Sequence, residues 1–243
     1  VCKNSNWHRP SRKSIILDAM SYTTLFIDLD ETVYPSSSGV WDAISERMER
    51  FMFERLNIPR EDIPRIRKEL FEQYGTTLRG LQMTRHVDER EFVAYVHDIP
   101  VAQMIQPNPA LRQTLLRYPQ QKIIFTNADR EHAKRVIQCV ELEGCFDGIV
   151  DILDLSPYCK PMPEAFEIAM RAAGEEDPGR CVFIDDSPHN LAAGREFGFY
   201  TIQVCDPKAG LQHLPSPAHA RIACLNDLPS VLDPRSNHQP PAR

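Results

Sequence analysis

Short apolar runs alternate with amphipathic segments along most of the chain. Six of the runs have the length and composition of buried strands and lie at 23–30, 122–127, 148–152, 181–185, 200–204 and 221–225. Between them, 130–142 and 163–173 carry apolar side chains at helical spacing. Strands that alternate with helices are typical of a parallel sheet with right-handed crossovers. The pattern therefore predicts an α/β fold in which helices cover both faces of a three-layer core.

One long segment, 36–105, interrupts this alternation and contains no convincing strand. Its apolar positions follow helical spacing, first in Trp41, Ile44, Met48, Phe51 and Met52 and then in 63–74 and 89–97. The segment is either a packing appendage or a lid. Ligands of such sheets bind beyond the carboxyl ends of the strands, so an insertion directly after the first strand favours a lid.

The domain boundaries follow from these patterns. A core made of 22–35 and 106–232 carries an all-helical cap at 36–105. Residues 1–21 are polar and basic and lack the apolar middle of a secretory signal. Residues 233–243 are polar and proline-rich. Both ends are predicted to be disordered.

Composition narrows the range of partners. The formal net charge is -6 and the isoelectric point about 5.8, which argues against a nucleic-acid polymer, whose phosphates require basic surfaces. A small phosphorylated substrate agrees with this charge, because a divalent cation reverses the local field. No apolar run has the length of a membrane helix. The seven cysteines include no C-x-x-C pair, so a reducing, cytoplasmic location is expected. The sequence leaves the oligomeric state open.

The first predicted strand ends in two acids, Asp28 and Asp30, followed by Glu31 and Thr32. Two carboxylates one residue apart on a strand point to the same side. If they are buried together they repel each other, and one becomes protonated unless a cation lies between them. Magnesium, which prefers oxygen ligands, is the natural occupant. Taken alone, the same residues fit an acidic loop equally well.

Two further segments add a hydroxyl and a cation. Thr126 and Asn127 close the second strand, where a hydroxyl and the amides of a following helix bind phosphate oxygens. A helix cap explains these residues as well. Lys160 precedes Pro161, a residue type that favours the first turn of a helix, and its ammonium would neutralise a carboxylate and a phosphate. A solvated surface lysine is the alternative.

The fourth site, Asp185 and Asp186, ends another apolar strand. Two adjacent acids are costly there unless they are exposed or bind a metal. An acidic turn before a helix at Pro188 is the alternative. The order acid pair, hydroxyl, lysine and acid pair, each after a strand, favours one shared site. Together these residues supply a nucleophile, an acid or base, a metal site and phosphate-binding groups, as a phosphoaspartyl intermediate requires.

In this order, the four motifs resemble those of the haloacid dehalogenase superfamily over about 22–232. A closer resemblance is to the pyrimidine 5'-nucleotidase group of bacteria, fungi and plants. It is carried by DLDETVYP at 28–35, YGTTLRGL at 74–81, FTNA at 125–128 and DDS at 185–187. The resemblance implies a Rossmann-like core with a helical cap, and a magnesium-dependent phosphatase acting on a nucleoside 5'-monophosphate.

The resemblance also implies which residues carry out the reaction. Asp28 is the expected nucleophile and a metal ligand. Asp30 is the expected acid and base, and it also meets the metal through its backbone carbonyl. The presence of Asp30 argues against dehalogenation, because true dehalogenases of the superfamily lack this second acid.

The remaining motif residues are expected to bind phosphate and metal. Thr126 and Asn127 bind the transferring phosphoryl group in this interpretation, and Lys160 holds both that group and the nucleophile. Asp186 corresponds to the usual metal ligand of the fourth motif, and Asp185 is a further ligand or its neighbour.

Three alternatives share part of this pattern. A sugar-phosphate phosphatase or a phosphomutase has the same core, and differs in whether the cap excludes water from the intermediate. A receiver-like phosphoacceptor is shorter and lacks a helical insertion. A degenerate binding scaffold would have lost the catalytic side chains that are present here. Five residues of the cap could face the site but fit the surface or a packing role equally well: Tyr74, Thr77, Arg79, Arg85 and His86. The substrate stays open.

Overall fold

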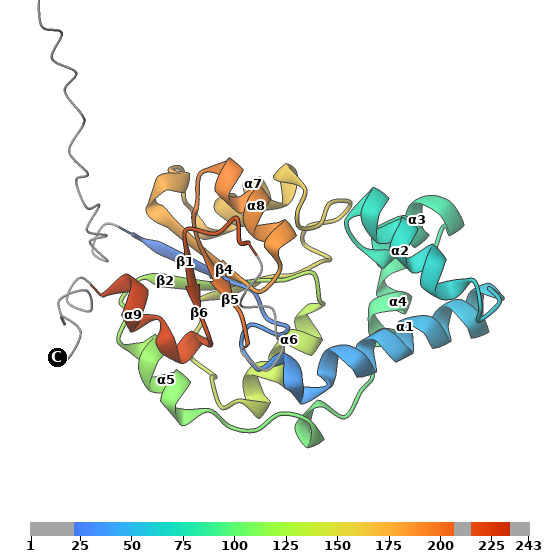
Figure 1. The fold of residues 1–243 in the computed structure, drawn as a ribbon, viewed down its shortest axis with the longest axis horizontal. Coiled ribbons are helices and arrows are strands. Elements are labelled where there is room, and N and C mark those ends of the chain that lie inside the picture. The colour runs from blue at the N-terminus through green and yellow to red at the C-terminus, as the bar shows by residue number, and fades with distance from the viewer. Residues whose placement is uncertain (1–21, 207–214, 234–243) are drawn as a thin grey trace, which may run out of the picture.

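A six-stranded parallel sheet forms the centre of the molecule (Figure 1). The computed structural model describes residues 22–206 and 215–233, so the predictions for 1–21 and 234–243 lie outside the described residues. The strands are β1 (Thr24–Ile27), β2 (Gln121–Phe125), β3 (Gly148–Val150), β4 (Cys181–Asp185), β5 (Tyr200–Val204) and β6 (Ala220–Ile222). Their order across the sheet is β3-β2-β1-β4-β5-β6. The predicted α/β fold class is confirmed, and each strand overlaps its predicted range.

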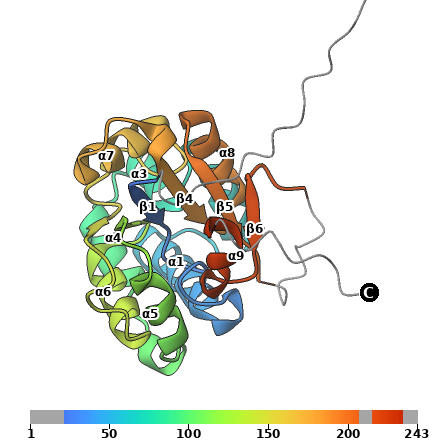
Figure 2. The same ribbon diagram turned by 90° about the vertical axis from the view of Figure 1, so that its left-hand side faces the viewer.

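Helices cover both faces of this sheet (Figures 1 and 2). On one side lie α7 (Pro163–Ala173) and α8 (Pro188–Phe197), and on the other α5 (Pro109–Leu116), α6 (Arg130–Cys139) and α9 (Pro229–Leu232). Helix α6 is shorter than the predicted helix at 130–142, because Val140 leaves the helical conformation and Glu141 has a positive φ of 58°. None of the helices in the described ranges is long and apolar enough to cross a bilayer.

The apolar runs of the sequence become strands that are buried on both faces. Leu25 and Ile27 of β1 pack with α5 and α6, whereas Phe26 between them packs with α7. Successive side chains of a strand point to opposite faces, so a strand in the middle layer needs apolar residues at every position. This burial explains why these segments have no polar alternation.

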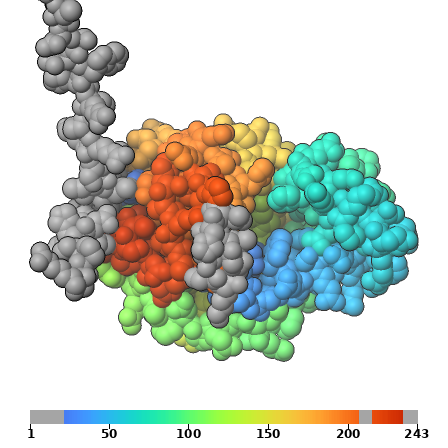
Figure 3. Space-filling view, in the orientation of Figure 1, coloured from blue at the N-terminus to red at the C-terminus, as the bar shows by residue number. Residues whose placement is uncertain are grey.

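Four helices follow β1 as an insertion: α1 (Val40–Leu56), α2 (Ile63–Tyr74), α3 (Thr77–Arg85) and α4 (Glu89–Val96). They project beside the sheet as a separate lobe (Figures 1 and 3), called here the helical lobe. Buried Phe51, Leu70, Leu81 and Phe92 give this lobe a hydrophobic cluster of its own. The sequence pattern predicts α1, α2 and α4 but not α3.

Arg79 of α3 joins the helical lobe to the core. Its side chain is 3% exposed and pairs with Glu89 at 2.8 Å. It also donates to the backbone carbonyls of Ile152, at 2.6 Å, and Tyr158, at 3.0 Å, both in the loop after β3. A buried arginine with this many acceptors links the two parts of the molecule by charge-assisted hydrogen bonds.

Candidate active site

The carboxyl ends of the three central strands meet at one edge of the sheet. Strand β1 pairs with both β2 and β4, and all three run parallel. Asp28 follows β1, Thr126 follows β2, and Asp185 is the last residue of β4. The loop between β3 and α7 brings Lys160 to the same edge. Ligands of parallel sheets bind at this edge, so the fold gathers the four predicted motifs where chemistry is expected.

Lys160 lies between two of the predicted carboxylates. Its ammonium Nζ is 2.6 Å from Asp28 Oδ1 and 2.8 Å from Asp185 Oδ2, and its side chain is 1% exposed. The surface-lysine alternative is therefore wrong. Helix α7 begins at Pro163 rather than Pro161, so Lys160 reaches the site from a loop and not from a helix start.

Thr126 and Asn127 are placed differently from each other. Thr126 is 1% exposed, and its hydroxyl accepts a hydrogen bond from the Ala128 backbone N–H at 3.0 Å. The Asn127 side-chain amide donates to the Lys160 carbonyl at 3.0 Å and accepts from the Lys160 N–H at 2.9 Å. The side chain of Asn127 thus fixes the backbone of the buried lysine.

Three carboxylates lie close enough to share one cation. Asp28, Asp185 and Asp186 have oxygen atoms within 4.8 Å of one another. Asp185 is held by the Ser187 N–H at 2.8 Å and by the side-chain amide of Asn190 at 3.2 Å. All the potential metal ligands in this group are hard carboxylate oxygens, which suit magnesium. The carboxylate of Asp30 is not a member of this group among the described residues.

The electrostatics of this group leave a deficit of positive charge. Burial raises the pKa of Asp28 to about 7, with Lys160 opposing the rise and Asp185 adding to it. Burial, followed by Asp185 and Asp28, raises the pKa of Asp186 well above its usual range. Burial alone would lower the pKa of Lys160, but Asp185 and Asp28 raise it. A single ammonium faces three carboxylates, and a divalent cation would offset the remaining repulsion.

Asp30 has two partners that the sequence-based site did not include. Its Oδ1 accepts hydrogen bonds from the Tyr34 hydroxyl, at 2.6 Å, and from His132 Nε2, at 2.9 Å. Burial alone would raise the pKa of Asp30, but His132 and the two hydrogen bonds lower it. A signal for His132 was present in the sequence, because it lies one helical turn before Val136 on the apolar face of the predicted helix at 130–142.

A cavity of about 620 Å³ lies between the strand ends and the helical lobe. From the core it is lined by Asp28, Asp30, Thr126, Asn127, Lys160 and Asp186. From the helical lobe the lining includes Trp41, Arg67 and Phe71. Trp41 and Phe71 are 43% and 50% exposed, an unusual state for large aromatic side chains. The cavity therefore combines an acidic floor with an aromatic wall.

The five residues of the helical lobe that were left open in the sequence divide into three groups. Thr77 lines the cavity. Arg79 binds the loop after β3, as described above. Tyr74, Arg85 and His86 are not among the described residues that line the cavity, and the last two are exposed.

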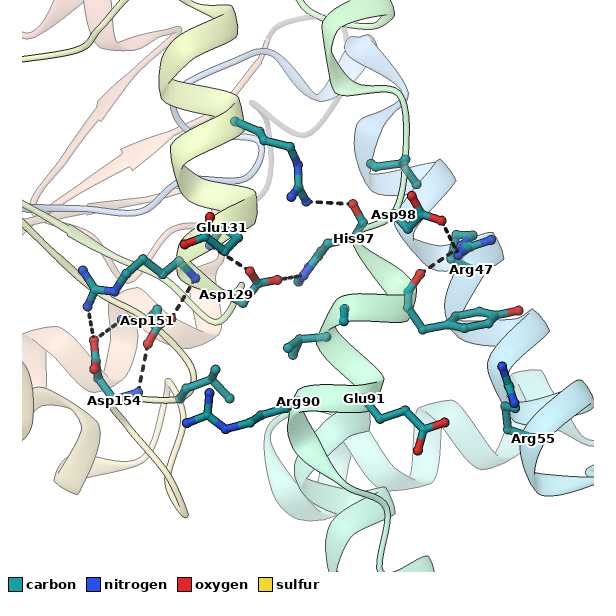
Figure 4. Close-up of a pocket in the computed structure, with 17 residues that line it drawn as sticks. Arg47, Arg55, Arg90, Glu91, His97, Asp98, Asp129, Glu131, Asp151 and Asp154 are labelled. Carbon is teal, nitrogen blue, oxygen red and sulfur yellow. Dashed lines mark hydrogen bonds and ion pairs between the residues drawn. The ribbon is translucent and has the colours of Figure 1, made fainter.

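A second cavity, of about 910 Å³, is drawn in Figure 4. It shares Val93 and His97 with the first cavity. Its lining mixes arginine and acidic side chains that pair with one another, as Arg47 does with Asp98. The His97 ring points from the end of α4 towards Asp129 at the start of α6, and the two form a hydrogen bond. None of the clustered carboxylates lines this second cavity.

The family follows from comparison with known proteins. A model of the haloacid dehalogenase-like hydrolase family matches residues 22–198. The chain belongs to this family. Phosphate metabolism protein 8 from Saccharomyces cerevisiae is 25% identical to this haloacid dehalogenase-like hydrolase over 187 residues, which are 71% of the chain. The chain spans 58% of the length of that curated relative.

Solved structures of other proteins share the fold of this chain. The HAD-hydrolase YfnB from Bacillus subtilis, described as bound to magnesium, matches with a TM-score of 0.58 and 20% identity, over 87% of this chain and 99% of its own. L-2-haloacid dehalogenase from Xanthobacter autotrophicus matches with a TM-score of 0.54 and 16% identity, over 87% and 98%. At these identities the likeness concerns the fold, and this haloacid dehalogenase-like hydrolase shares it with enzymes of different chemistry.

Proposed function

We propose that this hydrolase is a magnesium-dependent phosphatase that cleaves phosphate monoesters through an aspartyl-phosphate intermediate. The observation that carries the proposal is the buried Lys160 ammonium between Asp28 and Asp185, beside a third carboxylate at the strand ends. The magnesium would be held by Asp28, Asp185 and Asp186 and by the backbone carbonyl of Asp30. When bound, the ion neutralises negative charge on the carboxylates and on the phosphate.

The reaction assigned to these residues has two steps. In the first, an Asp28 carboxylate oxygen forms a bond to phosphorus, the bond from phosphorus to the ester oxygen breaks, and Asp30 gives its proton to that oxygen. In the second, the oxygen of a water molecule forms a bond to phosphorus while Asp30 takes a proton from that water, the bond from phosphorus to the Asp28 oxygen breaks, and inorganic phosphate leaves with the Asp28 carboxylate restored. Thr126 and Lys160 bind the transferring group and neutralise its charge. Asn127 supports them by fixing the lysine backbone.

The pKa of Asp30 agrees with its proposed roles as general acid and general base. Its pKa is lowered in the free protein, so its carboxylate is ready to accept a proton from water. The negative charge of a bound monoester raises this pKa, because like charges disfavour the ionised form of a carboxyl group. The same group therefore serves as acid when the ester is bound and as base afterwards.

The helical lobe supports a nucleotide as the substrate, and we assign it the role of a cap over 36–105. Trp41 and Phe71 offer exposed aromatic faces inside the cavity, on which a nucleobase can stack. Arg67 lies in the same wall, paired with Glu49 at 2.9 Å, and presents polar groups beside these rings. The resemblance to the pyrimidine 5'-nucleotidase group favours uridine and cytidine monophosphates among the nucleotides.

A phosphate-release assay with magnesium tests this proposal on nucleoside 5'-monophosphates and on sugar monophosphates. We expect release from pyrimidine nucleotides at higher kcat/KM than from sugar phosphates. Asp28→Asn should lose about 10³-fold or more of the activity, because it removes the nucleophile. Removal of the metal by EDTA should abolish turnover, and added magnesium should restore it.

The matched control is Asp98→Asn, which makes the same change at an 81%-exposed side chain outside the acidic cluster and should keep wild-type activity. If Asp28→Asn released phosphate at the wild-type rate, Asp28 would not be the nucleophile. Transfer of the phosphoryl group to a sugar without release of phosphate would identify a mutase instead.

A further inference from the structure

His132 is a fully buried histidine directly beside the cavity. It lies in the first turn of α6, is 0% exposed, and contacts Asp30 through Nε2 at 2.9 Å. Its other ring nitrogen, Nδ1, has no hydrogen-bond partner among the described residues. The tautomer with its hydrogen on Nε2 satisfies this arrangement, since the ring then donates to the carboxylate and leaves no donor unpaired.

One neighbour stacks on this ring and another holds the backbone of His132. His97, at the end of α4, stacks on it with 4.5 Å between ring centroids and 19° between ring planes. Asp129 accepts from the His132 backbone N–H at 3.0 Å and also binds the His97 ring. His132 is therefore held by its own helix and by a residue of the helical lobe.

The two oxygens of Asp30 have different surroundings. Oδ1 accepts from both Tyr34 and His132. Oδ2 has no partner among the described residues, is not sealed from solvent, and belongs to a residue that lines the cavity. Two donors on Oδ1 favour negative charge on that atom, so a proton taken up by the carboxyl group resides on Oδ2, which is the free oxygen.

We infer that His132 is a positioning residue that, with Tyr34, engages Oδ1 of Asp30 and presents Oδ2 to the ester oxygen of the substrate. The inference rests on the proposed phosphatase function. In the first step the Oδ2–H bond breaks, its proton goes to the ester oxygen as the bond to phosphorus breaks, and that oxygen keeps the bonding electron pair. Without the ring, the Asp30 side chain rotates away from the productive geometry.

The chemistry of the leaving group separates positioning of the acid from a general structural effect. An alkoxide leaves with difficulty unless it is protonated, so an alkyl monoester depends on Asp30. A 4-nitrophenolate leaves readily without a proton. The kcat/KM of each ester reports the first step, and so excludes the later hydrolysis of the intermediate.

The experiment compares 4-nitrophenyl phosphate with glycerol 2-phosphate, with magnesium, for the wild type and three variants. His132→Leu removes the donor and keeps much of the volume. We expect its kcat/KM for glycerol 2-phosphate to fall about 10- to 100-fold and that for 4-nitrophenyl phosphate less than about threefold. His132→Gln, whose amide can reach the same oxygen, should recover most of the loss. Asp30→Asn gives the reference pattern, with a larger loss on the alkyl ester.

Three results would contradict the positioning role of His132. Equal losses on the two esters, no loss on either, or a His132→Gln variant as impaired as His132→Leu would each overturn the positioning role. If His132→Leu does not fold, His132→Asn takes its place, because its shorter amide falls short of Asp30. If the wild type releases phosphate from neither ester and from no nucleoside 5'-monophosphate, the proposed phosphatase function fails. If it accepts only nucleotides, uridine 5'-monophosphate replaces glycerol 2-phosphate as the alkyl ester, and loss on the nucleotide in His132→Leu with recovery in His132→Gln carries the test. An active wild type without these differences between the variants rejects the positioning role alone.

Discussion

At the scale of single residues, the charge balance at the strand ends depends on Lys160. Its ammonium is enclosed by Asp28 and Asp185 and is removed from solvent. A buried charge that loses its partner is costly, because the low dielectric of the interior gives it no other compensation. Lys160 thus stabilises the folded chain as well as the phosphoryl group that we assign to this site.

Lys160→Met should lower the free energy of unfolding by about 3–5 kcal/mol when EDTA is present, since two buried carboxylates then face each other. Magnesium should restore part of the loss, because the ion neutralises the same carboxylates. Urea unfolding with and without magnesium measures both effects.

Lys68→Met is the matched control. Lys68 is 75% exposed, and its contact with Glu72 is 3.8 Å long, so its replacement should change stability by less than about 0.5 kcal/mol in either condition. A Lys160→Met chain as stable as the wild type in EDTA would contradict the charge-balance argument.

At the scale of elements, α2 and α3 pack unusually closely at Gly80. A Cβ atom built on Gly80 would lie 2.6 Å from Leu70 Cβ and 2.7 Å from Leu70 Cδ2. Leu70 Cβ is fixed to the backbone of α2, so the helices themselves would have to separate. Gly80, the second glycine of the YGTTLRGL segment, is therefore explained by packing within the helical lobe and not by contact with a substrate.

Gly80→Ala should destabilise the protein by about 1–3 kcal/mol through overpacking, despite the better helix propensity of alanine. Thermal unfolding measures this change. Met83→Ala on the same helix is the control, because the Met83 side chain is 67% exposed and its truncation should cost less than about 0.5 kcal/mol. A stabilised Gly80→Ala protein would show that the two helices move apart at little cost.

The same elements show what the sequence could predict. Cys181–Asp185 and Tyr200–Val204 are strands within the predicted bounds, because strands buried on both faces have uninterrupted apolar runs. Helix α3 escaped prediction because Thr77, Gly80 and Thr84 are poor helix formers, and its packing against α2 outweighs their propensity.

The candidate site also contains residues that the sequence predicts and one that it does not. The acid pairs and Thr126 end apolar strands, and parallel strands bring such ends together, so local pattern was sufficient to group them. The contact between His132 and Asp30 joins residues 102 positions apart, and no periodicity in the sequence encodes that pairing. Residues that orient a reactive group from another element require the tertiary structure.

At the scale of the whole molecule, the polar contacts that join the helical lobe to the core include those of Arg79 with the loop after β3 and of His97 with Asp129. Burial lowers the pKa of His97, and the hydrogen bond to Asp129 only partly opposes this effect. The pKa of Asp129 is lowered to about 2: burial alone would raise it, but the hydrogen bond from His97 outweighs that effect. A neutral His97 that donates to an ionised Asp129 accounts for the lowered pKa of both residues.

This contact predicts how acid affects stability. The unfolded His97 takes up a proton near its ordinary pKa of 6.5, whereas the folded one resists it, so its contribution to stability is present above pH 6.5 and is lost as the pH falls below that value. Between pH 7.5 and 5.5 the free energy of unfolding should fall by about 1 kcal/mol more in the wild type than in His97→Asn, which keeps a donor for Asp129 but has no ring to protonate. Urea unfolding at the two pH values gives the difference. His86→Asn changes an exposed ring and should keep the wild-type slope. Equal slopes in the wild type and His97→Asn would mean that protonation of His97 does not weaken the joint between the helical lobe and the core.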